Sequence, residues 1–226
     1  MQLTPRQSSK VEKVCMNHIY RLVWSRLNHS WVVVSESARG QGKKVNRKLS
    51  LLVVVVALGT TSLCNVVAAP AGGQVTAGTG TISQTGNTTT INQSTQNLSL
   101  SWSQFNVAPQ EIVNFVQPSS ASIAVNRILS TNGSQILGQI NANGQVYLIN
   151  PNGVLFGLGS QVNVGGLVAS TLNISDASLA SNIRSFSGSG TGSVINQGAI
   201  NTPDGGYVAL LGNTVSNQGM LNCINN

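Results

Sequence analysis

Short strand patterns separated by tight turns run through residues 72–226. Apolar and polar residues alternate at 98–103, with Trp102 on the apolar face, and they alternate again at 161–164. Other runs are apolar throughout, and Asn-Gly or Asp-Gly dipeptides between strand patterns predict turns. The apolar runs are 146–149, 154–156 and 207–211, and the dipeptides are 132–133, 143–144, 152–153 and 204–205. The pattern predicts an all-β fold, which is a sandwich, a barrel or a solenoid.

An internal repeat favours the solenoid. The segment 194–201 recurs at 215–222 with an offset of 21 residues. This period suits one coil of a parallel β-helix, in which apolar residues point inward and equivalent Asn side chains hydrogen-bond along the stack. With coils about 4.8 Å apart, residues 72–226 would form about seven coils. Two similar hairpins of a sandwich are the alternative.

A short helix is predicted around 175–181, where Ser175 or Asp176 could cap its first turn. A loop that projects from the coil is the alternative there. The glycines at 188–192 do not match a phosphate-binding motif and indicate a flexible loop.

A basic cluster stands directly before the apolar run 49–58, and small residues follow that run. The run is too short to span a membrane, so the order of basic, apolar and small residues predicts a secretory signal. Cleavage is expected after Ala69 or after Ala71, where Ala69 and Ala71 form an A-x-A site. An uncleaved anchor is the alternative.

The net charge of +7 belongs to the N-terminal part of the chain. Residues 1–48 carry ten of the twelve basic residues and two of the five acids, a net charge of +8. Residues 49–226 carry two basic residues and three acids, a net charge of −1. Because so few basic groups cannot neutralise several phosphates, a nucleic-acid partner is excluded for this part.

No catalytic chemistry is expected in residues 72–226. Both histidines precede this part, which excludes a Ser-His or Cys-His nucleophile there. The acids Glu111, Asp176 and Asp204 are far apart in the sequence and are interpreted as surface charges. Zinc would need Cys or His ligands that this part lacks. We therefore expect no enzyme, no metal site and no cofactor.

Three aromatic residues leave a different function open. Trp102, Tyr147 and Tyr207 could stack on sugars if the chain were a self-contained β-helical adhesin that binds surface glycans. Each lies within an apolar strand pattern, which favours packing in the core.

The leader has a second part before the signal. Residues 16–42, which begin with Met16-Asn17-His18-Ile19-Tyr20, resemble the extended signal-peptide region of very large secreted proteins of Gram-negative bacteria. The resemblance implies that residues 1–71 are an extended signal peptide, with 16–42 as the extended region and 43–71 as the signal proper. Met16 is then an alternative start of the chain.

The body of the chain resembles the two-partner secretion domain of filamentous haemagglutinin, also called the haemagglutination activity domain. The resemblance rests on Asn150-Pro151-Asn152-Gly153 within 139–157, and on the segments 113–119, 162–171 and 204–212. It implies that 72–226 fold as a right-handed, single-stranded parallel β-helix of the pectin-lyase-like type. An N-terminal cap and extra-helical hairpins are expected. A second family motif, N-P-N-L, does not occur in this sequence.

The resemblance also implies a function. The domain would be the N-terminal secretion domain of a large exoprotein, which is a filamentous haemagglutinin or adhesin, or a carrier of a contact-dependent growth inhibition toxin. Its partners would be the inner-membrane export machinery and an outer-membrane β-barrel transporter with periplasmic transport-associated domains. A host or neighbouring-cell surface is a further candidate partner. The repeat pattern stops after Gly219, so a C-terminally truncated domain is expected, secreted to the cell surface of a Gram-negative bacterium.

The motif at 150–153 has two interpretations, which stay open at this point. Pro151 fixes its φ at about −65° at the second position of a turn. Asn152 is expected to adopt a left-handed conformation, and Gly153 releases the chain into the next strand. The motif is therefore either the site that the transporter recognises or a turn that the β-helix needs for folding.

Overall fold

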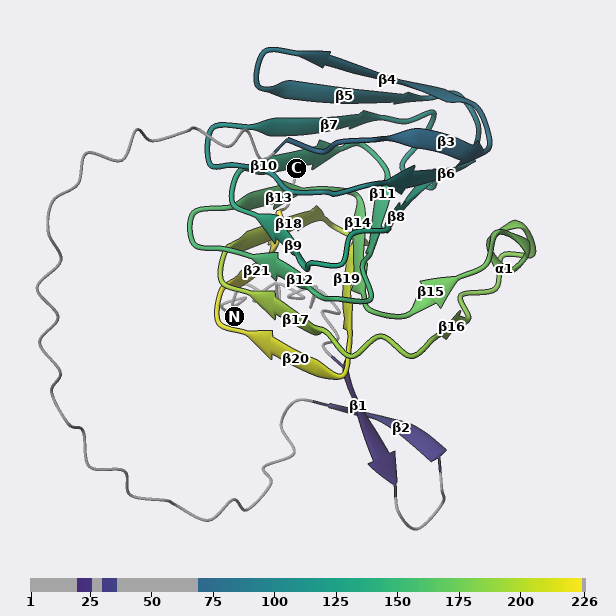
Figure 1. Cartoon of the computed structure of the whole chain (residues 1–226), viewed down its shortest axis with the longest axis vertical. Helices are drawn as coiled ribbons and strands as arrows, with labels where there is room; N and C mark the ends of the chain where they lie inside the picture. Colours follow the sequence, from purple (N-terminus) through teal and green to yellow (C-terminus); the bar gives the residue numbers. More distant parts are fainter. Residues whose placement is uncertain (1–19, 26–29, 36–68, 225–226) are drawn as a thin grey trace, which may run out of the picture.

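The computed structural model describes residues 20–25, 30–35 and 69–224. Residues 69–224 form a parallel β-helix of about six turns whose axis is vertical in Figure 1. The predicted β-helix is therefore confirmed, and the sandwich is wrong. The apolar run 49–58 of the predicted signal lies outside the described residues.

Three sheets, whose strands are parallel except at the N-terminal end, form the faces of the β-helix. Sheet 1 contains β21 (Met220–Ile224), β18 (Ala199–Pro203), β13 (Gln161–Asn163), β10 (Gln139–Ala142), β7 (Ile112–Val116), β5 (Thr88–Gln93) and β4 (Gly80–Thr85). Sheet 2 contains β19 (Tyr207–Leu211), β14 (Gly166–Ser170), β11 (Gln145–Ile149), β8 (Ile123–Ile128), β6 (Asn97–Trp102) and β3 (Gln74–Ala77). Sheet 3 contains β20 (Thr214–Asn217), β17 (Ser193–Asn196), β12 (Val154–Phe156) and β9 (Ser134–Ile136). Each complete turn contributes one strand to each sheet.

The register of the last turns is the one that the repeat predicts. Val194 pairs with Val215 in sheet 3, and Ala199 pairs with Met220 in sheet 1. The estimate of seven coils is too high for two reasons. The N-terminal strands β3 and β4 pair antiparallel with β6 and β5 and form a cap instead of a turn, and a long insertion lengthens one turn.

This insertion leaves the β-helix after β14 and returns at β17. It contains β15 (Asn173–Ile174), α1 (Asp176–Ala180) and β16 (Phe186–Ser187), and β15 pairs antiparallel with β16. The Oγ of Ser175 accepts a hydrogen bond from the N–H of Ser178, so the predicted helix and its cap are confirmed. Strands β1 (Tyr20–Ser25) and β2 (Ser30–Ser35) form a further, two-stranded antiparallel sheet.

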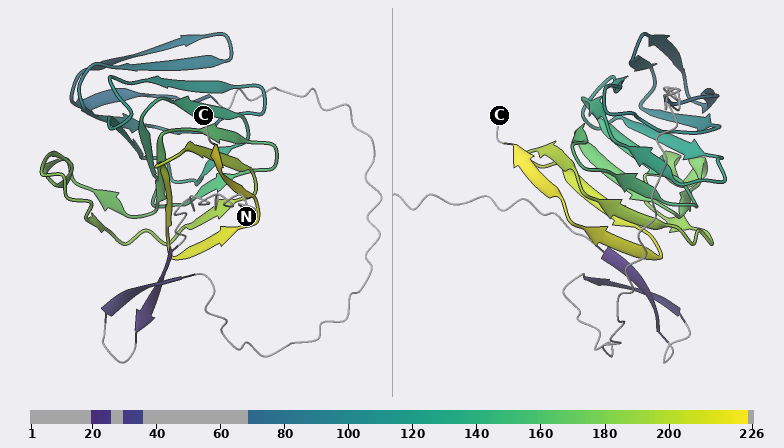
Figure 2. Two further views of the ribbon diagram at one scale, coloured as in Figure 1. Left: turned by 180° about the vertical axis from the view of Figure 1, so that it is seen from behind. Right: turned by 60° about the vertical axis from the view of Figure 1, so that its left-hand side comes forward.

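The interior of the β-helix is filled by columns of apolar side chains, one residue from each turn. In sheet 1 the column contains Val113, Ile140, Val162 and Ile200, all of them fully buried. Inward-pointing strand residues at equal register stack in this way because a parallel sheet repeats every strand separation. The view in Figure 2 that is turned by 60° shows the strands of successive turns stacked along the axis.

A second apolar cluster lies outside the β-helix. Side chains on the outer face of sheet 2 pack against the insertion: Ile123, Val125, Tyr147, Ile149 and Val168 from the sheet, with Ile174, Leu179 and Phe186 from the insertion. The insertion is therefore anchored by its own small core, to the right of the β-helix in Figure 1.

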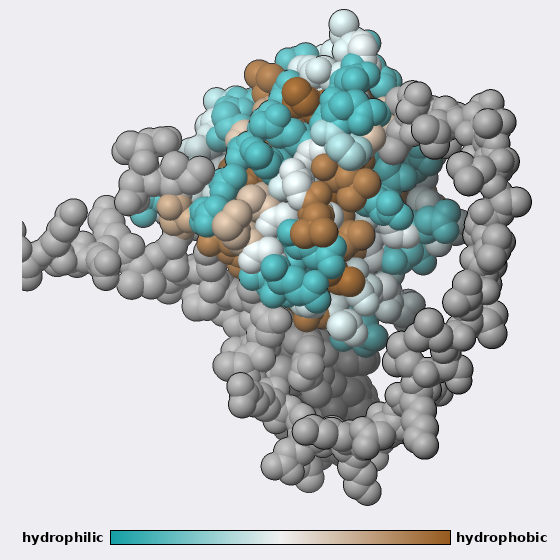
Figure 3. All heavy atoms as spheres, turned by 90° about the vertical axis from the view of Figure 1, so that its left-hand side faces the viewer, coloured by the Kyte–Doolittle hydropathy of each residue, from teal (hydrophilic) through white to brown (hydrophobic). Residues whose placement is uncertain are grey.

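The surface carries scattered apolar side chains. On the face shown in Figure 3, apolar residues form small patches separated by polar ones. The largest exposed fractions belong to Leu158 (81%), Leu129 (72%) and Met220 (60%). Within the described part of the chain, no helix has the length and apolarity needed to cross a membrane.

Candidate functional site: the turn at 150–153 and the surfaces around it

Asn150 holds the turn from the inside. It is fully buried, and its Nδ2 donates to the carbonyl oxygen of Asn132 and to the Oγ of Ser134, both at 3.0 Å. Its Oδ1 accepts a hydrogen bond from the N–H of Asn152 at 2.9 Å. Its carbonyl oxygen accepts one from the N–H of Gly153 at 2.9 Å, which closes the turn. Asn150 therefore ties this turn to the neighbouring turn of the β-helix.

The middle of the motif faces outward. Pro151 and Asn152 are both exposed. The Nδ2 of Asn152 donates to the carbonyl oxygen of Ser130 at 2.8 Å, so that side chain lies along the preceding coil. The motif thus divides into a buried pair, Asn150 and Gly153, and an exposed pair.

The left-handed conformation expected at Asn152 is found one residue later. Gly153 has a φ of +106°, whereas Asn152 has a negative φ. The prediction for Asn152 is wrong because the turn closes with two right-handed central residues and places its glycine at the fourth position, as type I turns favour. An added Cβ at Gly153 would also lie 2.6 Å from the carbonyl oxygen of Ser193.

The returning end of the insertion packs against this turn. The N–H of Gly192 donates to the carbonyl oxygen of Pro151 at 3.1 Å. A Cβ at Gly192 would clash with backbone atoms of Asn152 and Gly153. The glycines at 188–192 therefore allow close backbone approach at Gly192, a role that the interpretation as a flexible loop missed.

Two shallow hollows flank the exposed pair. One, of about 700 Å³, lies on the outer face of sheet 3, and its lining includes Asn152, Leu155 and Ile195. The other, of about 210 Å³, lies towards the insertion, and its lining includes Pro151 and Asn152. The exposed part of the motif is thus accessible from both sides.

The two expected cleavage residues lie at the start of the described body. Ala71 forms an antiparallel bridge with Gln104: its N–H donates to the Gln104 carbonyl at 3.0 Å, and its carbonyl accepts from the Ser103 N–H at 3.0 Å. Ala69 has no strand assignment, and Pro70 between them is buried. Cleavage after Ala69 would keep this bridge, whereas cleavage after Ala71 would remove it.

The three acids lie in three different parts of the fold. Glu111 is buried before β7, and its Oε2 accepts from the N–H of Ala108 at 2.7 Å. Asp176 belongs to the insertion, and Asp204 lies in the turn between β18 and β19. Glu111 is thus not the surface charge that the sequence predicted. Among the residues whose side chains the structure describes, no group of three or more His, Cys, Asp or Glu could hold a metal.

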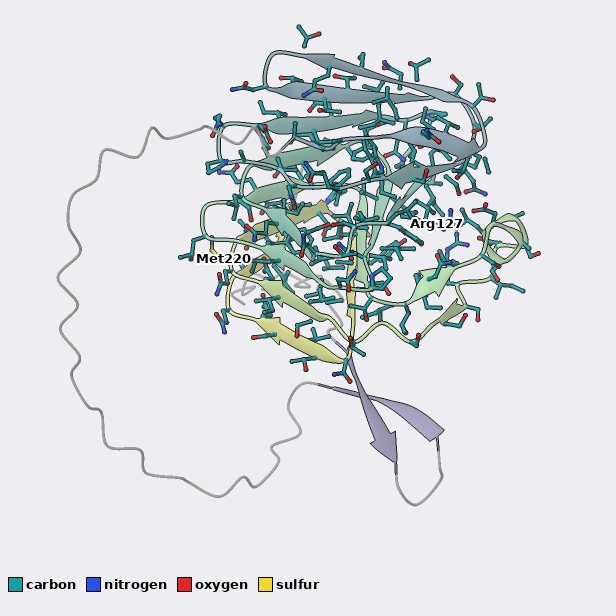
Figure 4. All side chains as sticks on the ribbon, in the orientation of Figure 1. Arg127 and Met220 are labelled. Atoms are coloured by element: carbon teal, nitrogen blue, oxygen red, sulfur yellow. The ribbon has the colours of Figure 1, made fainter. Side chains whose placement is uncertain are left out.

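Asp176 pairs with Arg127 of β8 and fastens the insertion to sheet 2. The distance from the Nη2 of Arg127 to the Oδ1 of Asp176 is 2.7 Å, and the same nitrogen donates to the Ile174 carbonyl at 2.7 Å. Figure 4 shows Arg127 between the sheet and α1. Although partial burial raises the pKa of Asp176, hydrogen bonds from Ser99 and Arg127 and the charge of Arg127 lower it below its usual value of 3.8.

The aromatic candidates for sugar stacking are mainly core residues. Trp102 and Tyr147 are each 1% exposed. The indole N–H of Trp102 donates to the Oδ1 of buried Asn126 at 3.0 Å. Tyr207 is half-buried; its hydroxyl lies 2.8 Å from that of Tyr147 and donates to the Oε1 of Gln145 at 2.6 Å. Core packing is therefore confirmed for Trp102 and Tyr147.

An asparagine ladder crosses the outer face of sheet 1. Five Asn side chains at equal register are joined by Nδ2–H to Oδ1 hydrogen bonds of 2.9, 3.0, 2.7 and 2.8 Å, in the order Asn114, Asn141, Asn163, Asn201, Asn222. The sequence repeat predicted such stacking of Asn amides, and Asn201 and Asn222 are its members in the ladder. The earlier three members were missed because they do not share the 21-residue offset.

Comparisons with known proteins agree with the geometry. The profile described as "TPS secretion domain" matches residues 66–224, and the profile described as "Extended Signal Peptide of Type V secretion system" matches residues 16–65. The chain belongs to the family of two-partner secretion (TPS) domains. The role of these domains is structural and in protein export, and it is not an enzymatic one.

Three relatives are similar to parts of this chain. A heme/hemopexin-binding protein of Haemophilus influenzae strain Rd is 36% identical over an alignment of 171 residues that covers 70% of this chain and 18% of that protein. A second heme/hemopexin-binding protein of H. influenzae is 40% identical over 97 residues, 43% of this chain and 10% of that protein. The crystal structure of the HMW1 secretion domain from H. influenzae has a TM-score of 0.63 and 36% identity, and covers 67% of this chain and 41% of that one.

The family and the extended signal peptide show to which location the protein is exported. The protein is exported across the Gram-negative envelope to the cell surface, and a TPS domain implies a cognate outer-membrane transporter. The chain spans less than a fifth of the length of the curated relatives that it matches.

Proposed function

We propose that residues 72–226 are the secretion domain of a much larger exoprotein, an adhesin or haemagglutinin or a carrier of a contact-dependent growth inhibition toxin. Residues 1–71 are its extended signal peptide, which delivers the chain to the inner-membrane export machinery and is cleaved after Ala69 or Ala71. The observation that carries the proposal is the TPS match over 66–224, together with a matched relative several times longer than this chain. From that relative we take over only the export role.

The fold supports a mechanism in which the chain crosses the outer membrane extended and folds outside. Every parallel strand pair joins residues of different turns, as in Gly166 with Tyr207. Such non-local pairing is slow to form, so the periplasmic chain stays available to the transport-associated domains of the transporter. These domains bind an extended segment by β-augmentation, and stacking outside prevents the chain from sliding back.

The two halves of the motif have separate roles in this proposal. The buried residues Asn150 and Gly153 shape the turn, because their contacts are made only within the folded β-helix. Pro151 and Asn152 are exposed in the folded β-helix, so the fold constrains their side chains less, and it is these side chains that the transporter recognises in the extended chain. Both roles that the sequence left open are then present in one motif.

Export assays test this division. The chain is co-expressed with its transporter, and the secreted fraction is measured for Pro151→Ala, Asn152→Ala and Asn150→Ala. We expect the first two variants to secrete at least about tenfold less while keeping the wild-type free energy of unfolding within about 1 kcal/mol, and Asn150→Ala to have a lower free energy of unfolding.

Pro203→Ala is the matched control. Pro203 is also exposed and begins a turn closed by the N–H of Gly206, which donates to the Pro203 carbonyl at 2.9 Å. The proposal for the exposed half fails if Pro151→Ala and Asn152→Ala secrete as well as Pro203→Ala and the wild type. A loss of secretion only in Asn150→Ala would assign the whole motif to folding.

A self-contained adhesin that stacks sugars on its aromatic residues is the weaker candidate. Trp102 and Tyr147 lie in the core, so they offer no ring face to a ligand. No other observation on these aromatic residues favours it.

A further inference from the structure

The outer face of sheet 1 combines a periodic amide array with an absence of charge. None of the described strands of this sheet contains Asp, Glu, Lys or Arg. The asparagine ladder crosses five of its strands, and four of the five side chains are partly buried. Each Asn uses one N–H within the ladder except Asn114, which only accepts.

The ladder leaves hydrogen-bonding capacity unused. An Asn amide has two N–H groups and a carbonyl oxygen with two lone pairs. Among the described residues, the hydrogen bonds of Asn141, Asn163 and Asn201 take up one N–H and one lone pair each. Because the two N–H bonds of a planar amide diverge, the second N–H of each residue points away from the line of the ladder. The array therefore presents donors and acceptors at each strand.

Two adjoining hollows lie beside the ladder. One is about 520 Å³ and reaches from Thr90 and Val116 to Asn163; the other is about 310 Å³ and reaches from Asn163 to Pro203. They share Ala142, Asn143 and Asn163 in their lining. Together they form a groove that crosses the strands and so follows the axis of the β-helix.

The lining of this groove combines amides with apolar surface. The ladder supplies the amides, and the exposed side chains of Val116 and Pro203, each two residues beyond a ladder Asn on its strand, supply apolar surface. Strands in a sheet are about 4.8 Å apart, so the three intervals from Asn114 to Asn201 span about 14 Å. One strand interval is close to the length of one sugar ring in an extended polysaccharide.

We propose that this groove binds a neutral, extended oligosaccharide through the asparagine ladder. Sugar hydroxyls both donate and accept, which matches amides that offer an N–H and a lone pair at each step. The C–H face of a sugar ring suits the apolar surface of Val116 and Pro203. A charged polymer would find no counter-charge on this sheet, and a peptide strand pairs along a sheet edge instead of crossing its face. The inference is independent of export.

Side-chain amide spectra of the exported chain test the proposal directly. The chain is isolated from the medium, labelled with ¹⁵N, and titrated with cellohexaose, laminarihexaose and maltohexaose. We expect saturable shifts of the Asn141 and Asn163 side-chain amides with at least one of the three. No shift with any of them would overturn the proposal, as would equal shifts with a heparin hexasaccharide, which is charged.

Two ladder variants separate binding from a purely structural role. Asn163→Val removes the amide that lines both hollows, and Asn222→Val removes an end of the ladder that lines neither. We expect at least a tenfold loss of affinity in Asn163→Val and none in Asn222→Val. Equal affinity in the two variants would overturn the proposal. If Asn163→Val does not fold, the wild-type spectra still decide.

Discussion

Gly153 is the position in the turn that least tolerates a side chain. Its φ of +106° is costly for any residue with a Cβ, and the carbonyl oxygen of Ser193 lies only 2.6 Å from the position that this Cβ would take. We expect Gly153→Ala to lower the free energy of unfolding by about 3 kcal/mol or more, the sum of strain and a clash with backbone. Urea unfolding measures the change.

Gly159→Ala separates the two contributions. Gly159 has a φ of +83° with open space around its Cβ position, so only the conformational cost of about 1 kcal/mol applies. Equal losses in the two variants would show that the Ser193 contact adds nothing. The whole loss in Gly153→Ala would then come from its backbone conformation.

Single residues were predictable where their pattern was local. The alternation around Trp102 correctly places its ring inside, because side chains on a strand point to opposite faces in turn. The conformation of Asn152 was not predictable, since an Asn-Gly pair fits several turn types. The buried position of Glu111 also had no signal in the sequence, because it depends on how the turn after Ala108 folds back.

One of the contacts that fasten the insertion to sheet 2 is an ion pair that no sequence pattern predicts. Arg127 and Asp176 are 49 residues apart, and neither lies in a charged motif. The helix itself was predictable from Ser175 and the residues after it, because capping is local. Its attachment to sheet 2 was not, because the β-helix register decides which strand residue faces it.

The protonation of Asp176 gives the insertion a pH dependence. Since the pKa of Asp176 is lower in the folded state than in the unfolded state, its contribution to stability is present above the usual value of 3.8 and is lost as the pH falls through the lowered value. We expect the corrected hydrogen-exchange protection of 173–187 to drop selectively between about pH 6 and about pH 3. Asp176→Asn should remove most of this pH dependence.

The contrary outcome is equally measurable. If the protection of the insertion relative to sheet 1 is the same at both pH values, the ion pair does not fasten it. Arg127→Lys tests the geometry: Lys would lack the planar group with which Arg127 also reaches Asn173 and the Ile174 carbonyl.

Among the larger elements, the repeat was the most informative feature of the sequence. Its 21-residue offset correctly predicts the pairing of β17 with β20 and of β18 with β21. The turns before β17 show no such repeat in the sequence, because the loops between their strands differ in length although the strands themselves pair in register.

At the scale of the whole molecule, stability depends on contacts between turns. Such a topology folds slowly, because loop closure must be completed before strand pairs form. We expect the chain without its leader to refold on the order of seconds or more, followed by the fluorescence of Trp102, its single Trp. Because this part has a net charge of only −1, salt should change the rate little. Refolding within milliseconds would contradict the proposed export of an extended chain.

The insertion between β14 and β17 shows how this architecture can vary. The chain leaves the coil for residues 171–192, where the preceding turn uses only 150–153, and yet β17 pairs in register with β12. A β-helix therefore tolerates an insertion at a corner, provided that the inserted segment begins and ends where a short turn would. New surface can be acquired there by lengthening one loop, while every stacked strand above and below keeps its neighbours.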